Sequence, residues 1–240
     1  MTQKNVLLAA VSEEVRAELR LEPVTLAFKD VLSEPNMAID AAYFPTSGVL
    51  SMVNEPSPGE IVEIATIGCE GFTGLPLLLG ADRMPSRVLA QIPGEGFRID
   101  KSHFVAAIEA NPGLRDLLMR YALALMGQIA QSTSCNRLHE VQERCARWLL
   151  QTHDRVDGDA FPLTQEFLAQ MLGVHRPTVT VAAGMLQKAG LISYSRGSVR
   201  VLDRTGLEAA SCPCYRFITQ EYDRLIGHRW SPRRGGTGSG

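Results

Sequence analysis

The sequence lacks any uninterrupted apolar run of the roughly 18 residues that a membrane-spanning helix needs. The apolar stretch near its start, Val6–Val11, is too short for the core of a signal peptide and is followed by no cleavage-site pattern. We therefore expect a cytoplasmic protein with no membrane partner.

Cysteine is scarce, with five in 240 residues, and the odd number does not suit a disulfide scaffold. We expect these thiols to be reduced, as in the cytosol. A composition of 45% hydrophobic and 21% charged residues excludes a disordered or collagen-like chain. At about 150 residues per domain, the length falls between one domain and two.

Net charge is also nearly absent, at −2, which by itself gives no indication of a nucleic acid partner. The charge is unevenly distributed, however. From Phe161 onward there are ten bases and five acids, a net charge of +5, whereas residues 1–160 carry 14 bases and 21 acids, or −7. Such asymmetry indicates two parts with different partners, the C-terminal one suited to an anion.

The common enzyme motifs are missing. The sequence has no P-loop, no dinucleotide-binding fingerprint and no nucleophile-elbow motif. A metal-dependent β-barrel enzyme would need clustered histidine and carboxylate ligands, yet no histidine precedes His103. We therefore predict that the protein is not an enzyme.

Between Pro23 and Asp100, short β-rich runs alternate with glycine- and proline-containing turns, which is typical of a β-barrel or sandwich. Residues 1–20 precede them and have the spacing of a short amphipathic helix. The expected strands are Val49–Val53, Glu60–Ile67, Arg87–Ile92 and Gly96–Ile99.

From Pro112 the spacing of apolar residues changes to steps of three and four, which predicts a long helix that could continue to Leu150 with a break near residues 132–134. Its apolar stripe needs a partner, either the side of the barrel or a second copy of the helix. We expect the second copy, and hence a homodimer. The candidate dimer residues are Leu114, Leu118, Tyr121, Leu125 and Ile129.

The segment that follows predicts two short helices joined by a tight turn. Thr164 can cap a first helix that ends near Leu172, and Gly173 suits a turn with positive φ. His175 can cap a second helix. The inward residues of that helix would be Val179, Ala182, Ala183 and Leu186. This arrangement is a helix-turn-helix.

Residues 192–202 alternate around Arg196-Gly197, which predicts a β-hairpin, or wing, behind the second helix. The first turns of the second helix would face base edges, and the wing would face the sugar-phosphate backbone. Arg176 suits guanine because its forked donors match O6 and N7. The candidate DNA-binding residues are Thr164, His175, Arg176, Thr178, Thr180, Ser195, Arg196, Ser198 and Arg200.

A specific set of residues lies between Leu163 and Leu202: Gly173, Arg176, Thr178, Val179, Leu186 and the run 190–192. Because of these residues, the segment from Leu163 to Leu202 resembles the C-terminal domain of the Crp/Fnr family of bacterial transcription regulators. Residues 20–110 resemble, less specifically, the family's cyclic-nucleotide-binding-type β-roll, and the helix from Pro112 resembles its dimerisation helix.

The resemblance implies an α+β protein with an N-terminal β-roll of the jelly-roll type, a long dimerisation helix and a C-terminal winged helix-turn-helix. The expected domains are 1–110, 111–152 and 153–240. A sequence-specific regulator of this type binds double-stranded DNA as a homodimer on a two-fold operator, and RNA polymerase is a further implied partner.

Two positions depart from the DNA-reading pattern of the family. Family members that read the best-known half-sites carry Glu directly after the recognition arginine and often a second Arg four residues beyond. Here Pro177 and Val181 stand at those positions. The family's usual half-site is therefore not expected, and only the Arg176–guanine contact carries over.

The sensory region departs further. Leu75 replaces the glutamate that holds the ribose in cyclic-nucleotide binders, and Met84-Pro85 stands where an arginine and a serine or threonine would hold the phosphate. We therefore expect the protein to bind neither cyclic AMP nor cyclic GMP, and we predict no cofactor. Binding of another, unidentified small effector remains an open alternative. The candidate pocket residues are Gly71, Gly74, Leu75, Arg83, Ser86 and Arg87.

The cysteines leave one alternative open. No cysteine precedes Cys69, so the N-terminal iron–sulfur site of the oxygen-sensing branch is not expected. The pair Cys212-Pro-Cys214, with the thiols Cys135 and Cys145, suits a redox- or metal-responsive regulator. The simpler interpretation, which we prefer, is two small residues at a helix start, with no metal site.

A lone histidine such as His103 or His139 as a haem ligand is a weaker hypothesis still.

Overall fold

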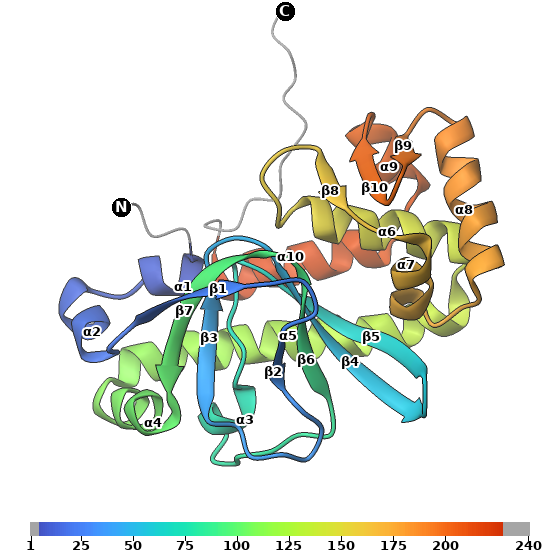
Figure 1. Ribbon diagram of the computed structural model, residues 1–240. Helices are drawn as coiled ribbons and strands as arrows, with labels where there is room; N and C mark the ends of the chain where they lie inside the picture. Colours follow the sequence, from blue (N-terminus) through green and yellow to red (C-terminus); the bar gives the residue numbers. More distant parts are fainter. Residues whose placement is uncertain (1–4, 228–240) are drawn as a thin grey trace, which may run out of the picture.

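The structure is a computed structural model that describes residues 5–227. A β-roll forms the N-terminal part, a long helix runs along it, and a smaller helical domain with its own sheet lies at one end (Figure 1). No helix among the described residues combines the length and the apolarity that a bilayer crossing requires.

Two antiparallel sheets make the β-roll. Their strand orders are β1-β7-β3 and β2-β6-β4-β5. The strands are β1 (Glu22–Leu26), β2 (Val31–Ser33), β3 (Ala41–Pro45), β4 (Val49–Ser57), β5 (Glu60–Ile67), β6 (Arg87–Ile92) and β7 (Gly94–Asp100). All four strands that the sequence predicts are present, with β5 and β6 at the predicted limits.

The helices of this part are mostly short. They are α1 (Val6–Ala9), α2 (Glu13–Glu18), α3 (Leu75–Leu78), α4 (Lys101–Ala110) and the long α5 (Pro112–Leu138). The prediction of a single helix over residues 1–20 is wrong for the described residues of this segment, 5–20, which form two helices. Ser12 accepts a hydrogen bond from the amide of Val15 and so starts a new helix where the first has ended.

Helix α5 corrects two expectations. It runs without a break to Leu138, and the chain turns at the extended residue His139 before α6 begins. Its predicted dimer stripe faces the protein's own core, since Leu114, Leu118, Tyr121 and Leu125 are at most 3% exposed and join the β-roll cluster. Ile129 is half-buried against the same cluster. The barrel side, and not a second copy, covers this stripe.

Up to Gly227, where the described residues end, the C-terminal domain contains four helices besides α6 and a three-stranded sheet of order β8-β10-β9. Its elements are α6 (Val141–His153), β8 (Ala160–Pro162), α7 (Gln165–Leu172), α8 (Arg176–Lys188), β9 (Ile192–Ser195), β10 (Ser198–Val201), α9 (Arg204–Ala210) and α10 (Cys214–Ile226). Helix α6 lies within the expected segment 111–152 with the dimerisation helix, yet it shares its apolar core with α7 and α8. The last helix, α10, leaves the domain and packs along α5 (Figure 1).

Candidate nucleic-acid interface and a cysteine cluster

The turn between α7 and α8 is built as its residues require. Thr164 caps α7 by accepting a hydrogen bond from the amide of Phe167 at 3.1 Å. Gly173 ends α7 with φ +62, a left-handed conformation that favours glycine. His175 is the N-cap residue of α8, without a side-chain hydrogen bond, and Pro177 lies in the first turn. The two helices therefore form the predicted helix-turn-helix.

Burial separates the two faces of α8. Val179, Ala182, Ala183 and Leu186 are at most 4% exposed and pack inward, as predicted. The opposite face is open to solvent. All nine predicted DNA-binding residues are exposed: Thr164, His175, Arg176, Thr178, Thr180, Ser195, Arg196, Ser198 and Arg200.

The wing forms as the sequence indicates. Strands β9 and β10 pair in antiparallel register, with Ser198 opposite Ser195. Arg196 and Gly197 both have positive φ, at +50 and +77, which is the geometry of a tight two-residue hairpin turn. Strand β8 adds a third strand to the wing through Phe161, which is opposite Val199.

The basic side chains of this surface are free to meet an anion. Among residues 5–227, Arg176, Arg196 and Arg200 form no ion pair with a carboxylate. Thr180 is engaged differently, because its hydroxyl donates to Oε1 of Gln165 at 2.8 Å and ties α8 to α7. The exposed arginines of helix and wing therefore lie on one domain without internal neutralisation.

The predicted effector-pocket residues have structural roles. A Cβ atom on Gly71 would lie 2.2 Å from Oη of Tyr121, and Gly74 starts α3 with φ +91 beside Ala42. Ser86 donates to Oδ1 of Asn54 at 2.7 Å. These contacts hold the roll together and give no direct support for a pocket at this position.

The arginines proposed to replace the phosphate ligand are also engaged. Nε of Arg87 lies 2.8 Å from Oε2 of Glu34, and Nη1 lies 3.5 Å from Oε2 of Glu55. Arg83 is exposed and pairs with its neighbour Asp82 at 3.2 Å. Leu75 is the first residue of α3 and is half-buried against the β-roll core.

Polar contacts join the roll to the C-terminal domain. Nε1 of Trp148 on α6 donates to Oε2 of Glu63 on β5 at 2.6 Å. Nη2 of Arg155, just after α6, lies 2.7 Å from Oε1 of Glu70, and both side chains are 0% exposed. Composition could not reveal these pairs, since their members are 85 residues apart in the chain.

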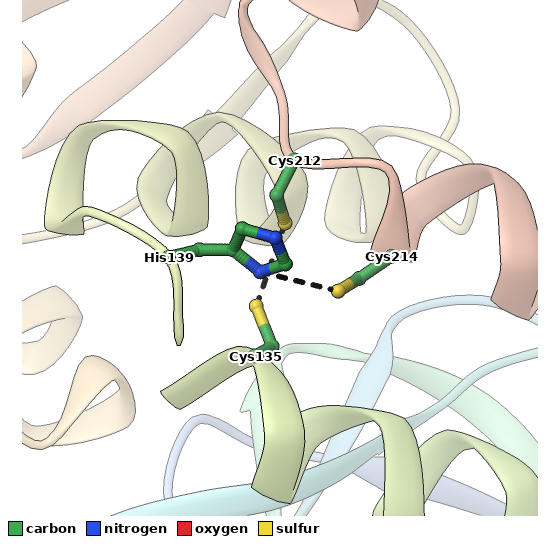
Figure 2. Close-up of side chains that lie close together, drawn as sticks. All are labelled: Cys135, His139, Cys212 and Cys214. Carbon is green, nitrogen blue, oxygen red and sulfur yellow. Dashed lines mark hydrogen bonds between the residues drawn. The ribbon is translucent and has the colours of Figure 1, made fainter. Parts of the chain in front are cut away.

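The cysteines provide the largest difference from expectation. Cys212 and Cys214 are not merely small residues at the start of α10, because they meet Cys135 and His139 at the end of α5 (Figure 2). Cys145, which was considered with them, lies apart in the core of the C-terminal domain. The remaining candidate haem ligand, His103, lies on α4 and is not part of this cluster.

Comparison with known proteins identifies the domain. Residues 143–210 match the model of the Crp-like helix-turn-helix domain. No curated protein matches the chain.

Solved structures match nearly the whole fold. FixK2 from Bradyrhizobium japonicum is 15% identical, with 81% of this chain and 98% of that chain covered and a TM-score of 0.69. A putative Crp/Fnr-family regulator from Eubacterium rectale is 16% identical, with 85% and 96% covered and a TM-score of 0.67. A CRP-family regulator from Thermus thermophilus is 17% identical, with 78% and 96% covered and a TM-score of 0.65. The chain thus combines a Crp-like helix-turn-helix with the fold of Crp/Fnr regulators, as the resemblance implied.

Proposed function

We propose that this chain, with its Crp-like helix-turn-helix on a Crp/Fnr-type fold, is a sequence-specific DNA-binding transcription regulator. The observation that carries the proposal is the exposed, unneutralised face of α8 and the wing, with Arg176 on the helix and Arg196 and Arg200 on the hairpin. Arginine binds guanine through two parallel hydrogen bonds and binds phosphate as a cation.

The two groups of arginines have different proposed roles. Arg176 is the first residue of α8, the end that a recognition helix turns toward base edges in the major groove. Arg196 and Arg200 belong to the wing, which would contact the sugar-phosphate backbone and contribute affinity without reading sequence. Pro177 has no amide or side-chain donor for a base, so the half-site differs from that of relatives with Glu at this position.

We further propose a homodimer on a two-fold operator. Helix α5 keeps an exposed apolar face in Met119, Leu123 and Met126, which are 41%, 51% and 56% exposed. Their steps of four and three place them on one side of the helix, away from the buried stripe. A second α5 would cover this face, and two recognition helices would then enter major grooves about 34 Å apart.

The test starts from an operator selected with the purified full-length chain from random duplex DNA. Affinity for the selected duplex should fall steeply between about 50 and 200 mM salt, because bound phosphates release their counterions. Fluorescence anisotropy measures this dependence. If no duplex is enriched and none is bound at low salt, the proposal is wrong.

Arg176→Ala should weaken binding to the selected operator by about 1–3 kcal/mol, because a bidentate contact to guanine is lost. Binding to random duplex should change little. The matched control is Arg115→Ala, which removes an exposed arginine near the start of α5, far from the helix-turn-helix. Equal losses on operator and random DNA would make Arg176 a phosphate contact instead.

A further inference from the structure

We propose that Cys135, His139, Cys212 and Cys214 form a binding site for one zinc-class divalent metal ion. Cys135 lies in the last turn of α5, and His139 is the residue directly after that helix. Cys212 and Cys214 flank Pro213 where α10 begins. Figure 2 shows the imidazole of His139 among the three thiol groups. The site goes beyond DNA binding and does not depend on it.

The spacing of the ligand atoms fits a single tetrahedral ion. All four atoms lie within 4.8 Å of one another. Sγ of Cys135 is 3.4 Å from Sγ of Cys212, and Sγ of Cys214 is 3.4 Å from Nδ1 of His139. In a tetrahedral zinc site with Zn–S bonds of about 2.3 Å, neighbouring ligand atoms are separated by about 3.8 Å. Closing around an ion therefore needs only side-chain adjustments.

The donor set selects the kind of ion. Three thiolates and one imidazole are ligands for zinc, and hard cations such as magnesium and calcium prefer oxygen. Four protein ligands fill a tetrahedron and leave no open position, which is the pattern of a structural site. A [4Fe–4S] cluster would hold its four ligands farther apart, because each of its four irons binds one of them.

Charge around the cluster favours thiolates. Arg144 and Arg147 on α6 are 7% and 5% exposed, and within residues 5–227 neither forms an ion pair with a carboxylate, although the charge of Arg147 also acts on the buried Glu63. Both arginines interact electrostatically with Cys135 and Cys212. A buried guanidinium is costly without a counter-charge. Three thiolates and a divalent ion have a net charge of −1, which provides that counter-charge.

Further contacts orient the ligands. Nε2 of Gln131, one turn before Cys135, donates to Sγ of Cys214 at 3.1 Å. Cys214 is also the first residue of α10, a helix of 13 residues whose N-terminal dipole stabilises a thiolate. Hydrogen bonds of this kind to ligand atoms are typical of metal sites.

The other two cysteines do not share these features. Cys145 is completely buried in the apolar core of the C-terminal domain, and burial raises the pKa of its thiol to about 12. Burial likewise raises the pKa of Cys69, to about 11. Within the part of the chain that the structure describes, neither belongs to a group of ligands, so both serve as internal controls for the proposed site.

The first experiment compares metal content. The full-length chain is produced in medium supplemented with zinc chloride, purified under reducing conditions and analysed by plasma mass spectrometry and native mass spectrometry. We expect about one zinc ion per chain in the wild type. The double variant Cys212→Ala/Cys214→Ala should lose it, whereas the matched double variant Cys69→Ala/Cys145→Ala should retain it.

The second experiment does not depend on folding of a variant. Zinc is removed from the wild-type chain with a chelator, and cobalt chloride is titrated into the reduced apoprotein. We expect saturation at about one equivalent with sulfur-to-cobalt charge-transfer bands and the ligand-field absorption of tetrahedral cobalt. His139→Ala should bind cobalt more weakly and with altered ligand-field bands.

Each alternative result overturns the proposal. A wild-type chain that contains no zinc and takes up no cobalt has no such site. A Cys135–Cys212 disulfide that persists under reducing conditions would make the cluster a cross-link. Bound iron with acid-labile sulfide would make it an iron–sulfur site, and metal retained by the Cys212→Ala/Cys214→Ala variant would place the ion elsewhere.

Discussion

Glu63 is a buried carboxyl group whose contacts fit its protonated form. Oγ of Ser51 lies 2.5 Å from Oε1 of Glu63 and 2.6 Å from Oε1 of Gln91. A hydroxyl has one proton, so Ser51 can donate in only one of these contacts. The second proton comes from the carboxyl group of Glu63 or from the NH2 group of Gln91, and a protonated Glu63 satisfies both contacts as they stand. Burial raises the pKa of Glu63 to about 7, although Ser51, Trp148 and the charge of Arg147 act in the opposite direction.

A pH dependence of stability follows. Below the ordinary pKa of 4.5, Glu63 is protonated whether the chain is folded or unfolded. As the pH rises toward 7, only the unfolded chain loses the proton, so the free energy of unfolding should fall, by about 3 kcal/mol in all. Glu63→Gln should lack this decrease. Urea unfolding of both proteins from pH 5 to 8 measures it, and a constant difference between them would mean that folded Glu63 is ionised throughout.

Gln131 offers a residue-scale test of the metal site. Gln131→Ala removes the N–H···S hydrogen bond to Cys214 and leaves all four ligands in place. We expect the affinity for zinc to fall about tenfold, because the loss of such a partner typically weakens metal binding by this order. Competition against a chromophoric chelator measures the affinity. Ser134→Ala, an exposed position on the same helix, should leave it unchanged.

At the scale of elements, the turn of the helix-turn-helix depends on one backbone angle. Gly173 has φ +62, and a Cβ atom there would lie 3.1 Å from Cγ2 of Val62. Gly173→Ala should therefore lower the free energy of unfolding by about 1–2 kcal/mol. Gly184 lies within α8 with open space around it, so Gly184→Ala should instead raise stability by about 0.5–1 kcal/mol. Urea unfolding of both variants tests the contrast, which equal effects would contradict.

The sequence predicts elements best where local chemistry decides them. Strands β5 and β6, the caps of α7 and the turn at Gly173 follow from residues close together in the chain. Strand β3 was missed because it is buried on both faces and shows no alternation. The end of α5 was missed because the apolar pattern continues across His139 into α6.

Pairing between distant elements was harder to predict. Within the metal site, Cys135 and His139 are four residues apart, and Cys212 and Cys214 are two apart. Each spacing alone is common in helices and turns. Only the return of α10 along α5 brings the two pairs together. The apolar stripe of α5 was ambiguous in the same way, since periodicity shows that a stripe is covered without showing what covers it.

At the scale of the whole molecule, assembly should depend on the exposed side of α5. Leu123→Glu places a charge on the proposed dimer face without touching the core, because Leu123 is 51% exposed. We expect the homodimer to dissociate into folded monomers, which light scattering after size-exclusion chromatography detects. Phe217→Glu, at a similarly exposed position on α10, is the control. A dimer that survives Leu123→Glu would have its interface elsewhere.

The proposed metal site also has a topological consequence. Cys135 and Cys212 are 77 residues apart, and the segment between them contains the whole Crp-like helix-turn-helix, residues 143–210. A bound ion would close this segment into a loop. For a loop of that length, chain-entropy arguments give a stabilisation of about 4.5 kcal/mol. The chain would then enter and leave the DNA-reading domain at a single anchored point. Loss of the ion would open this loop and leave the packing of α10 along α5 and the contacts of Trp148 and Arg155 with the roll to hold the domain in place.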